Sequence, residues 1–244
     1  MGFNMDANNT GATPHISQQM FASMAHELKS PLTLISGLSS ELQQKNLNIQ
    51  QYAKYAERIQ FSSDRLLGLV DSILQGYRLD QNMLELNLEP ICPKVIMEEV
   101  AHEMSPHARR QAQLISIKSF KKKQTIIADK HCLHAVLFNL LDNAIKYSNP
   151  ETTIELEARL RCGVAQLAVK DYGRGITKAE LKKLFCEFGK IKRPVPNWAS
   201  STGLGLYVAR QLTEAMNGHL DLARRKDGSS FLVNLQLSTQ LSLF

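Results

Sequence analysis

Hydrophobic residues between positions 15 and 80 recur at helical spacing, with few glycines or prolines between them. Two runs each contain four such residues seven positions apart: Phe21, Leu28, Ile35 and Leu42 in the first, and Tyr52, Ile59, Leu66 and Ile73 in the second. A seven-residue repeat is typical of one seam of a coiled coil. The polar stretch at 43–48 separates the runs, so the pattern predicts a hairpin of two helices.

The apolar faces of this hairpin are too wide for two helices to bury alone. Pairing with a second copy of the chain buries such faces in a four-helix bundle. We therefore expect a homodimer.

The pattern changes after position 83. Leu84, Leu86 and Leu88 alternate with polar residues as in a half-buried strand. Pro93 is expected to open a helix whose inward residues are Val95, Ile96, Val100 and Met104. Further strands are expected at 114–120, 153–162, 164–171, 220–224 and 230–237, and further helices at 130–147, 178–185 and 204–216. This alternation predicts one mixed or antiparallel sheet covered by helices, with a domain boundary near residue 85.

Composition narrows the class of protein. Of the 244 residues, 43% are hydrophobic and 21% are charged, which excludes a mainly disordered chain. The net charge of +6 could indicate nucleic-acid binding, but the basic residues are scattered, and only Lys121 to Lys123 form a run. We therefore expect no nucleic-acid partner. No Cys-x-x-Cys pair, apolar membrane span or leader pattern is present, so we expect a cytoplasmic protein without a membrane segment in this chain.

His26 is the first candidate for chemistry. Counted from Phe21 in the seven-residue repeat, it falls on the outward face of the expected bundle. An isolated histidine on a helix is normally a solvated polar residue. Here Glu27 follows directly, and a carboxylate can hold one imidazole nitrogen as N–H while the other keeps its lone pair for attack. Pro31 one turn later should bend the helix, which also suggests a site.

A second group of polar residues lies within the helix expected at 130–147. Asn139, Asn143 and Lys146 are four and three positions apart and therefore share one face. An amide oxygen is a hard ligand that suits magnesium, and an ammonium group suits the phosphates that magnesium accompanies. An ordinary amphipathic surface helix is the alternative interpretation of this segment alone.

Two short glycine segments complete the candidate chemistry. Asp171, Gly173 and Gly175 follow an expected strand, where the glycines allow close approach of a ligand and the carboxylate can accept from the amino group of adenine. Gly203 and Gly205 stand at a helix start, where free N–H groups favour phosphate. Neither segment is a Rossmann fingerprint or a Walker loop.

In their order along the chain, these segments resemble the sensor histidine kinases of two-component signalling. The resemblance rests on the following segments: the phosphoacceptor motif His26-Glu27-Leu-Lys-Ser30-Pro31, the asparagine motif at 139–148, the first glycine motif from Asp171 to Ile176, the phenylalanine motif at Phe185 and Phe188, and the second glycine motif Gly203-Leu204-Gly205-Leu206. It covers nearly the whole chain from about residue 15.

The resemblance implies an α+β fold. A two-helix hairpin forms a dimeric four-helix bundle, and an α/β sandwich ATP-binding domain with a mixed sheet covered by helices follows it. The implied domains are a flexible N-terminal segment at 1–14, a dimerisation and histidine phosphotransfer domain at 15–84, and a catalytic ATP-binding domain at 85–244.

The resemblance also implies residue roles. Asn143 would ligate Mg²⁺ with support from Asn139, Lys146 and Tyr147 would face the phosphates and ribose of ATP, and Asp171 would hold adenine. The remaining residues would shape the pocket and a lid at 188–201: Gly173, Gly175, Ile176, Gly203, Leu204, Gly205 and Leu206. Glu27 would orient His26, which takes the γ-phosphoryl group of ATP and passes it to an aspartate of a response regulator receiver domain.

Two departures from the family pattern concern Ser30 and Ser201. Many relatives have Thr or Asn at the position of Ser30, where that residue positions water for dephosphorylation of the regulator, so phosphatase activity is left open. Relatives often have Gly at the position of Ser201.

Three alternative functions or sites compete with this interpretation. A dimeric nucleotide-binding scaffold or pseudokinase would keep the pocket without transferring phosphate. An ATPase of the gyrase or chaperone type usually has a carboxylate, not an amide, at the position of Asn139. A metal site at His131, Cys132 and His134 lacks a further ligand nearby in sequence.

Overall fold

The computed structural model describes residues 18–43, 47–80, 85–119, 124–161, 163–186 and 203–238. The expected flexible segment at 1–14 lies outside these residues. The chain divides into two compact units. The first unit contains α1 (Gln18–Leu42), the part of α2 (Ile49–Asp80) up to Gly68, and Asp80. The second unit contains residues 69–79 of α2 and all described residues from 85 onward.

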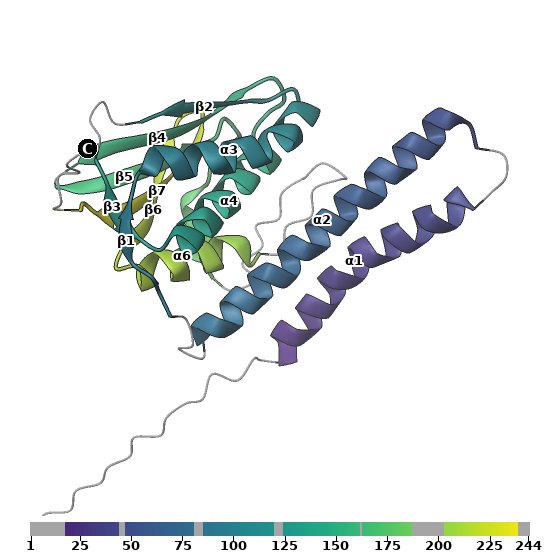
Figure 1. Cartoon of the computed structure of the whole chain (residues 1–244), viewed down its shortest axis with the longest axis horizontal. Helices are drawn as coiled ribbons and strands as arrows, with labels where there is room; N and C mark the ends of the chain where they lie inside the picture. Colours follow the sequence, from purple (N-terminus) through teal and green to yellow (C-terminus); the bar gives the residue numbers. More distant parts are fainter. Residues whose placement is uncertain are drawn as a thin grey trace, which may run out of the picture. The chain divides into compact units, whose positions relative to one another are not determined.

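The first unit is the expected helical hairpin, with α1 and α2 antiparallel (Figure 1). A reciprocal pair of hydrogen bonds starts α2: the backbone N–H of Gln51 donates to the side chain of Asn48, and the N–H of Asn48 donates to the side chain of Gln51, both at 2.9 Å. This is a capping box, which satisfies N–H groups that a helix start leaves unpaired. The start of α2 is thus encoded locally.

The seam of the hairpin is only partly covered within one chain. Leu38 is buried, whereas Leu28, Ile35, Ile59 and Leu66 are half-buried. Tyr52 of the second run is 38% exposed. The side chains of Phe21 and Ile73 lie outside the described part. Large apolar surface therefore remains available on both helices for a further partner.

The second unit is built on a five-stranded sheet in which only the β2–β4 pair is parallel. Across the sheet the strands are β2 (Leu114–Lys118), β4 (Thr153–Arg161), β5 (Val164–Lys170), β7 (Gly228–Gln236) and β6 (His219–Arg225). A separate antiparallel pair joins β1 (Glu89–Ile91) to β3 (Ile126–Ala128). The expected mixed sheet is confirmed.

Three helices cover one face of the sheet: α3 (Pro93–Arg110), α4 (Lys130–Tyr147) and α6 (Gly205–Ala215) (Figure 1). The short α5 (Lys178–Leu184) follows the sheet's central strands in sequence. Leu140 and Leu141 of α4 are fully buried with Ile154 of β4 and Val233 of β7. The core therefore lies between the helices and the inner face of the sheet, and α4 is its central helix.

Two expectations about this unit are wrong. Residues 85–88 form no strand, because the N–H of Asn87 donates at 2.9 Å to Oδ2 of Asp129, the residue that caps α4, while Leu84 lies outside the described residues. Val95 is 47% exposed instead of inward. Ile96, Val100 and Met104 are the buried set, because they recur every four residues and Val95 falls beside that stripe.

The expected strand bounds differ at their ends. The strand expected at 114–120 ends at Lys118, and Phe120 lies outside the described residues, as does Cys162 at the end of the strand expected at 153–162. None of the helices in the described part of the chain has the length and apolar character that crossing a bilayer requires.

Candidate nucleotide and phosphoacceptor sites

The helix α4 presents the predicted polar face. Its start is capped by Asp129, whose Oδ1 accepts from the N–H of Cys132 at 2.9 Å. Most apolar residues of α4 are buried: Leu133, Val136, Leu137, Leu140, Leu141, Ala144 and Ile145. Asn139, Asn143 and Lys146 are half-buried. Burial of the apolar residues thus sets the rotation of the helix and leaves the polar face accessible.

The two amide groups on this face are oriented by the helix itself. Nδ2 of Asn139 donates to the carbonyl of Ala135 at 3.0 Å, and Nδ2 of Asn143 donates to the carbonyl of Asn139 at 2.9 Å. Each amide therefore commits its nitrogen to the backbone, so its oxygen is the atom that can accept or ligate. The ammonium of Lys146 forms an ion pair with Asp142 one turn earlier.

The end of α4 is joined directly to the loop that follows β5. Ser148 forms an isolated antiparallel bridge with Gly173, and the N–H of Tyr172 donates to Oγ of Ser148 at 3.2 Å. A Cβ on Gly173 would lie 2.1 Å from the carbonyl oxygen of Tyr147, so no other residue fits there. Tyr147 and Gly173, which belong to separate sequence motifs, are therefore in backbone contact.

Asp171 is buried and firmly held. Its Oδ1 accepts from the N–H of Gly173 at 3.0 Å and from the N–H of Ser229 at 3.1 Å. Gly228 adopts φ +115°, and a Cβ there would lie 2.1 Å from the carbonyl oxygen of Asp171. Gly228 and Ser229, which contact Asp171, were not among the site residues predicted from the sequence. A Gly-Ser pair opening a strand was the available signal.

The rest of the first glycine motif is structural in character. Gly175 has φ +75°, and a Cβ there would lie 3.1 Å from the carbonyl oxygen of Gly228. Ile176 is buried in the core, and its carbonyl accepts from Nε of Arg224 at 3.2 Å. These residues hold the loop against the β6–β7 turn.

The second glycine motif meets α4 in space. A Cβ on Gly205 would lie 2.9 Å from Oδ1 of Asn139. Leu204 is buried, and its carbonyl accepts the first helical hydrogen bond of α6, from Val208 at 2.8 Å. Gly203 has φ +74°, and Leu206 is half-buried against the core. The structure thus brings Asn139 and Gly205 together, as a shared pocket requires.

A network of charged side chains lies beside the Asp171 loop. The hydroxyl of Tyr172 donates to Oε1 of Glu155 at 2.7 Å, and the guanidinium of Arg225 lies 4.6 Å above the Tyr172 ring. The Tyr172 hydrogen bond, aided by Lys118 and Lys170, lowers the pKa of Glu155 to about 2 although burial opposes this. Glu155 is therefore a carboxylate that anchors the neighbour of Asp171.

The predicted phosphoacceptor motif lies in α1. His26 and Glu27 belong to this helix, but their side chains lie outside the described residues, so the outward orientation of His26 stays a prediction. Ser30 is exposed, and the buried Pro31 lies within the continuous helix. The Ser30 side chain is therefore accessible to solvent.

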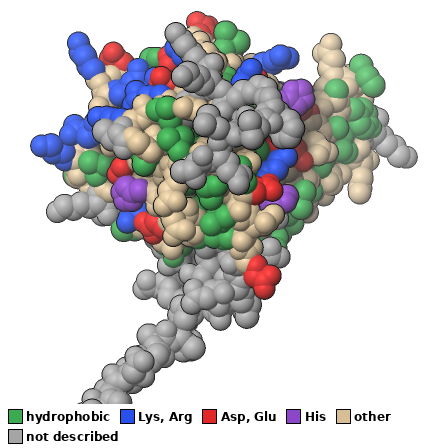
Figure 2. All heavy atoms as spheres, turned by 60° about the vertical axis from the view of Figure 1, so that its left-hand side comes forward, with side chains coloured by type: hydrophobic (Ala, Val, Ile, Leu, Met, Phe, Trp, Pro, Cys, Tyr) green, Lys and Arg blue, Asp and Glu red, His purple; other side chains and the backbone are tan. Residues whose placement is uncertain are grey.

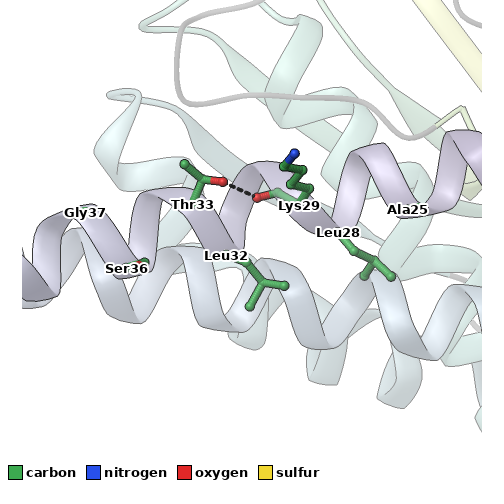
Figure 3. Close-up of a pocket in the computed structure, with 7 residues that line it drawn as sticks. All are labelled: Ala25, Leu28, Lys29, Leu32, Thr33, Ser36 and Gly37. Atoms are coloured by element: carbon green, nitrogen blue, oxygen red, sulfur yellow. Dashed lines mark hydrogen bonds between the residues drawn. The ribbon is translucent and has the colours of Figure 1, made fainter.

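A groove follows α1 and includes Leu28 and Lys29 of this motif (Figure 3). Its lining residues are Ala25, Leu28, Lys29, Leu32, Thr33, Ser36 and Gly37. The hydroxyl of Thr33 donates to the carbonyl of Lys29 at 2.8 Å, which turns the Thr33 methyl outward from the backbone. Leu32 is 50% exposed. The groove therefore combines apolar and polar surface and overlaps the motif.

The remaining candidates have ordinary structural contacts. Nε2 of His134 lies 3.1 Å from Oε2 of Glu103 on α3, and its ring stacks on Phe138. Burial raises the pKa of the Cys132 thiol to about 12, which disfavours the thiolate that binds metal. No group of three or more His, Cys, Asp or Glu side chains that could hold a metal occurs in the described part. The expected lid at 188–201 lies outside it.

Two family models match the chain. Residues 16–82 match the His Kinase A (phospho-acceptor) domain, and residues 128–239 match the histidine kinase-, DNA gyrase B-, and HSP90-like ATPase. A sensor histidine kinase, GacS of Pseudomonas protegens, is 28% identical over 228 residues, covering 91% of this chain and 25% of the relative. The chain thus spans about a quarter of the length of this curated relative.

Solved structures agree with the fold. Full-length ShkA in complex with AMPPNP has a TM-score of 0.65 and 26% identity, covering 91% of this chain and 46% of that one. Histidine kinase ThkA in complex with the response regulator protein TrrA has a TM-score of 0.66 and 21% identity, covering 90% of this chain and 61% of that one. With a phosphoacceptor hairpin, an ATPase-type sheet and these relatives, the chain belongs to the sensor histidine kinases of two-component signalling.

Proposed function

We propose that the chain is an ATP-dependent protein histidine kinase that phosphorylates its own His26 and relays the phosphoryl group to an aspartate of a response regulator. The observation that carries the proposal is the convergence of three distant segments in one unit. The polar face of α4 meets the Asp171 loop through Ser148 and Gly173, and meets the start of α6 through Asn139 and Gly205.

The nucleotide binds where these three segments meet. Asp171, held through Oδ1 by two backbone N–H groups, accepts from the amino group of adenine, whereas guanine offers an acceptor at that position and is disfavoured. Lys146 and Tyr147 face the phosphates and ribose. Binding requires Lys146 to exchange its ion pair with Asp142 for the phosphates, a swap between two anionic partners.

Asn143 suits a magnesium ion. Because its Nδ2 donates to the carbonyl of Asn139, its Oδ1 is the ligating atom, and an amide oxygen is a hard ligand of the kind magnesium selects. Asn139 supports the same site. When bound, Mg²⁺ offsets negative charge on the phosphate oxygens of ATP.

Transfer requires a neutral imidazole. A ring nitrogen of His26 attacks the γ-phosphorus, a phosphorus–nitrogen bond forms, and the bond to the bridging oxygen breaks so that ADP leaves with that electron pair. Glu27 orients the ring and accepts the proton from the other ring nitrogen. Lys146 stabilises the charge on the transferred group, so positioning supplies most of the catalysis.

The proposal includes two protein partners. The partly exposed seam of α1 and α2 supports a homodimer in which two hairpins form a four-helix bundle. A receiver domain of a response regulator docks beside His26, on the α1 surface that carries Ser30. Ser30 retains a hydroxyl that can position water for dephosphorylation of that regulator.

The proposed domains are a histidine phosphotransfer domain at 15–84 and a catalytic domain at 85–244. We propose that the protein works in the cytoplasm.

On the face drawn in Figure 2, acidic side chains lie among the Lys and Arg side chains. Among the described residues, Lys118 and Lys170 both lie within 3.4 Å of Glu155. This mixed charge favours protein partners over a nucleic acid.

A pseudokinase scaffold is the weaker alternative. His26, Asn143 and Asp171 are all present, and the backbone hydrogen bonds of Asn143 and Asp171 support the roles proposed for them. A gyrase-type ATPase is disfavoured because Asn139 offers an amide where water activation needs a carboxylate.

Incubation with γ-labelled ATP and Mg²⁺ tests the proposal. The chain should acquire acid-labile, alkali-stable label that His26→Gln abolishes while ATP binding persists. The exposed His102 on α3 provides a matched control, and His102→Gln should label like the wild type. Label that survives in His26→Gln rejects the assignment, and ATP binding with no label in the wild type supports the scaffold.

A further inference from the structure

Gln113 is a buried amide that the proposed mechanism does not use. It stands between α3 and β2, directly after Ala112, whose φ of +54° turns the chain. Its residue is 2% exposed. Its Nε2 lies 3.2 Å from the carbonyl oxygen of Ile145, 3.3 Å from that of Ser148 and 3.2 Å from that of Asn149. One side chain thus contacts three carbonyl oxygens, one in the last turn of α4 and two directly after the helix ends.

The carbonyl of Ile145 needs a donor because α4 ends there, whereas the carbonyl of Asn149 also accepts from the hydroxyl of Thr152 at 2.7 Å. The last helical hydrogen bond runs from the N–H of Ser148 to the carbonyl of Ala144. The next N–H, that of Asn149, turns away and donates to the carbonyl of Tyr172 at 3.4 Å. The carbonyl of Ile145 is therefore left without its helical partner, as happens at every helix end. Gln113 supplies that partner from outside the helix.

The capped junction is the one that assembles the nucleotide site. The last turn of α4 carries Lys146 and Tyr147, and the two residues that follow bind the Asp171 loop through Tyr172 and Gly173. Displacement of Ser148 and Asn149 would therefore shift the last turn of α4 and the Asp171 loop together. We propose that Gln113 is a positioning residue for the nucleotide, and this rests on the proposed function.

Burial of the Gln113 amide lowers the stability of the fold, and this supports a specific role for the amide. Oε1 of Gln113 is buried and has no hydrogen-bond partner among the described atoms. A buried acceptor without a partner destabilises the fold, so a similarly shaped apolar residue at this position would give a more stable fold. The donor half of the amide is therefore what the position requires.

Gln113→Met tests the inference in the full chain, because methionine keeps the length and removes the donor. Gln166→Met is the matched control, since Gln166 is a buried glutamine on β5 whose Nε2 donates at 2.8 Å to Asn234. ATP affinity, the KM for ATP, the rate at saturating ATP and thermal unfolding are measured for both. We expect about tenfold weaker ATP binding and a KM raised about as much in Gln113→Met, with the saturating rate within about twofold.

The outcomes separate the two proposals. Failure of the wild type to bind ATP rejects the proposed function. Wild-type binding with equal ATP affinity in Gln113→Met and Gln166→Met overturns the positioning role. If Gln113→Met does not fold, the side-chain amide resonances of Gln113 are followed by NMR in the wild type. Slow exchange and a shift on ATP binding support the role, and fast exchange or no shift overturns it.

Discussion

Gly205 at the start of α6 lies directly against the side chain of Asn139 on α4, and a Cβ on Gly205 would come 2.9 Å from Oδ1 of Asn139. Asn139 cannot easily yield, because its Nδ2 is already bound to the carbonyl of Ala135 at 3.0 Å. The absence of a side chain at Gly205 therefore helps to set the position of an amide in the proposed nucleotide site.

Gly205→Ala should weaken ATP binding about fivefold with little loss of stability. Alanine favours a helix over glycine by about 1 kcal/mol, which offsets part of the steric cost. Isothermal titration and thermal unfolding measure the two quantities. Gly68→Ala is the control, since nothing lies within 4 Å of a Cβ at Gly68. Unchanged ATP affinity in Gly205→Ala would show that the Asn139 contact has no part in binding.

Asp171→Asn should reduce ATP affinity by about 10-fold to 100-fold, because an NH₂ group then faces the amino group of adenine. The loss should be smaller for GTP, so the preference for ATP narrows. The amide oxygen of asparagine can still accept from Gly173 and Ser229, so the loop keeps its contacts. Competition binding with both nucleotides measures the ratio, with the exposed Asp221→Asn as control. An unaltered ratio contradicts adenine recognition by Asp171.

Asn143→Ala should remove most of the effect of magnesium on nucleotide binding. Affinity for ATP is measured with Mg²⁺ and with a chelator. We expect the two values to converge in Asn143→Ala, whereas Asn234→Ala, an asparagine of β7, should keep the wild-type difference. Persistence of the full magnesium effect would exclude Asn143 as a ligand.

Glu155→Gln should change the acid stability of the second unit. The folded-state pKa of Glu155 is about 2, below its ordinary value of 4.5, so the unfolded chain takes up the proton first as pH falls. Its stabilisation is complete above about pH 4.5 and is lost between pH 4.5 and 2. The variant should be less stable at pH 7 and should lose less stability across that window.

Urea unfolding at several pH values measures this effect. Glu89→Gln, at an exposed carboxyl of β1, serves as the control and should follow the wild type. Parallel pH curves for Glu155→Gln and the wild type would show that the hydrogen bond from Tyr172 does not stabilise the ionised carboxyl.

Much of the fold was predictable because it follows from local patterns. The seven-residue repeats indicated α1 and α2, and the polar face from Asn139 to Lys146 follows from helical spacing. The strands β1 and β3 were not predicted, since three residues are too few to show a period. Residues 85–88 alternate like a strand but bind the α4 cap, a tertiary contact that overrides the local pattern.

By itself, the sequence determined which residue types could bind a nucleotide or accept a phosphoryl group, because those depend on side-chain chemistry and on spacing within one helix or turn. Only the tertiary structure decided that Asn139 meets Gly205, that Ser229 holds Asp171, and that Gln113 caps α4. These contacts join residues far apart in the chain. They depend on how the helices pack on the sheet, and local spacing carries no information about that packing.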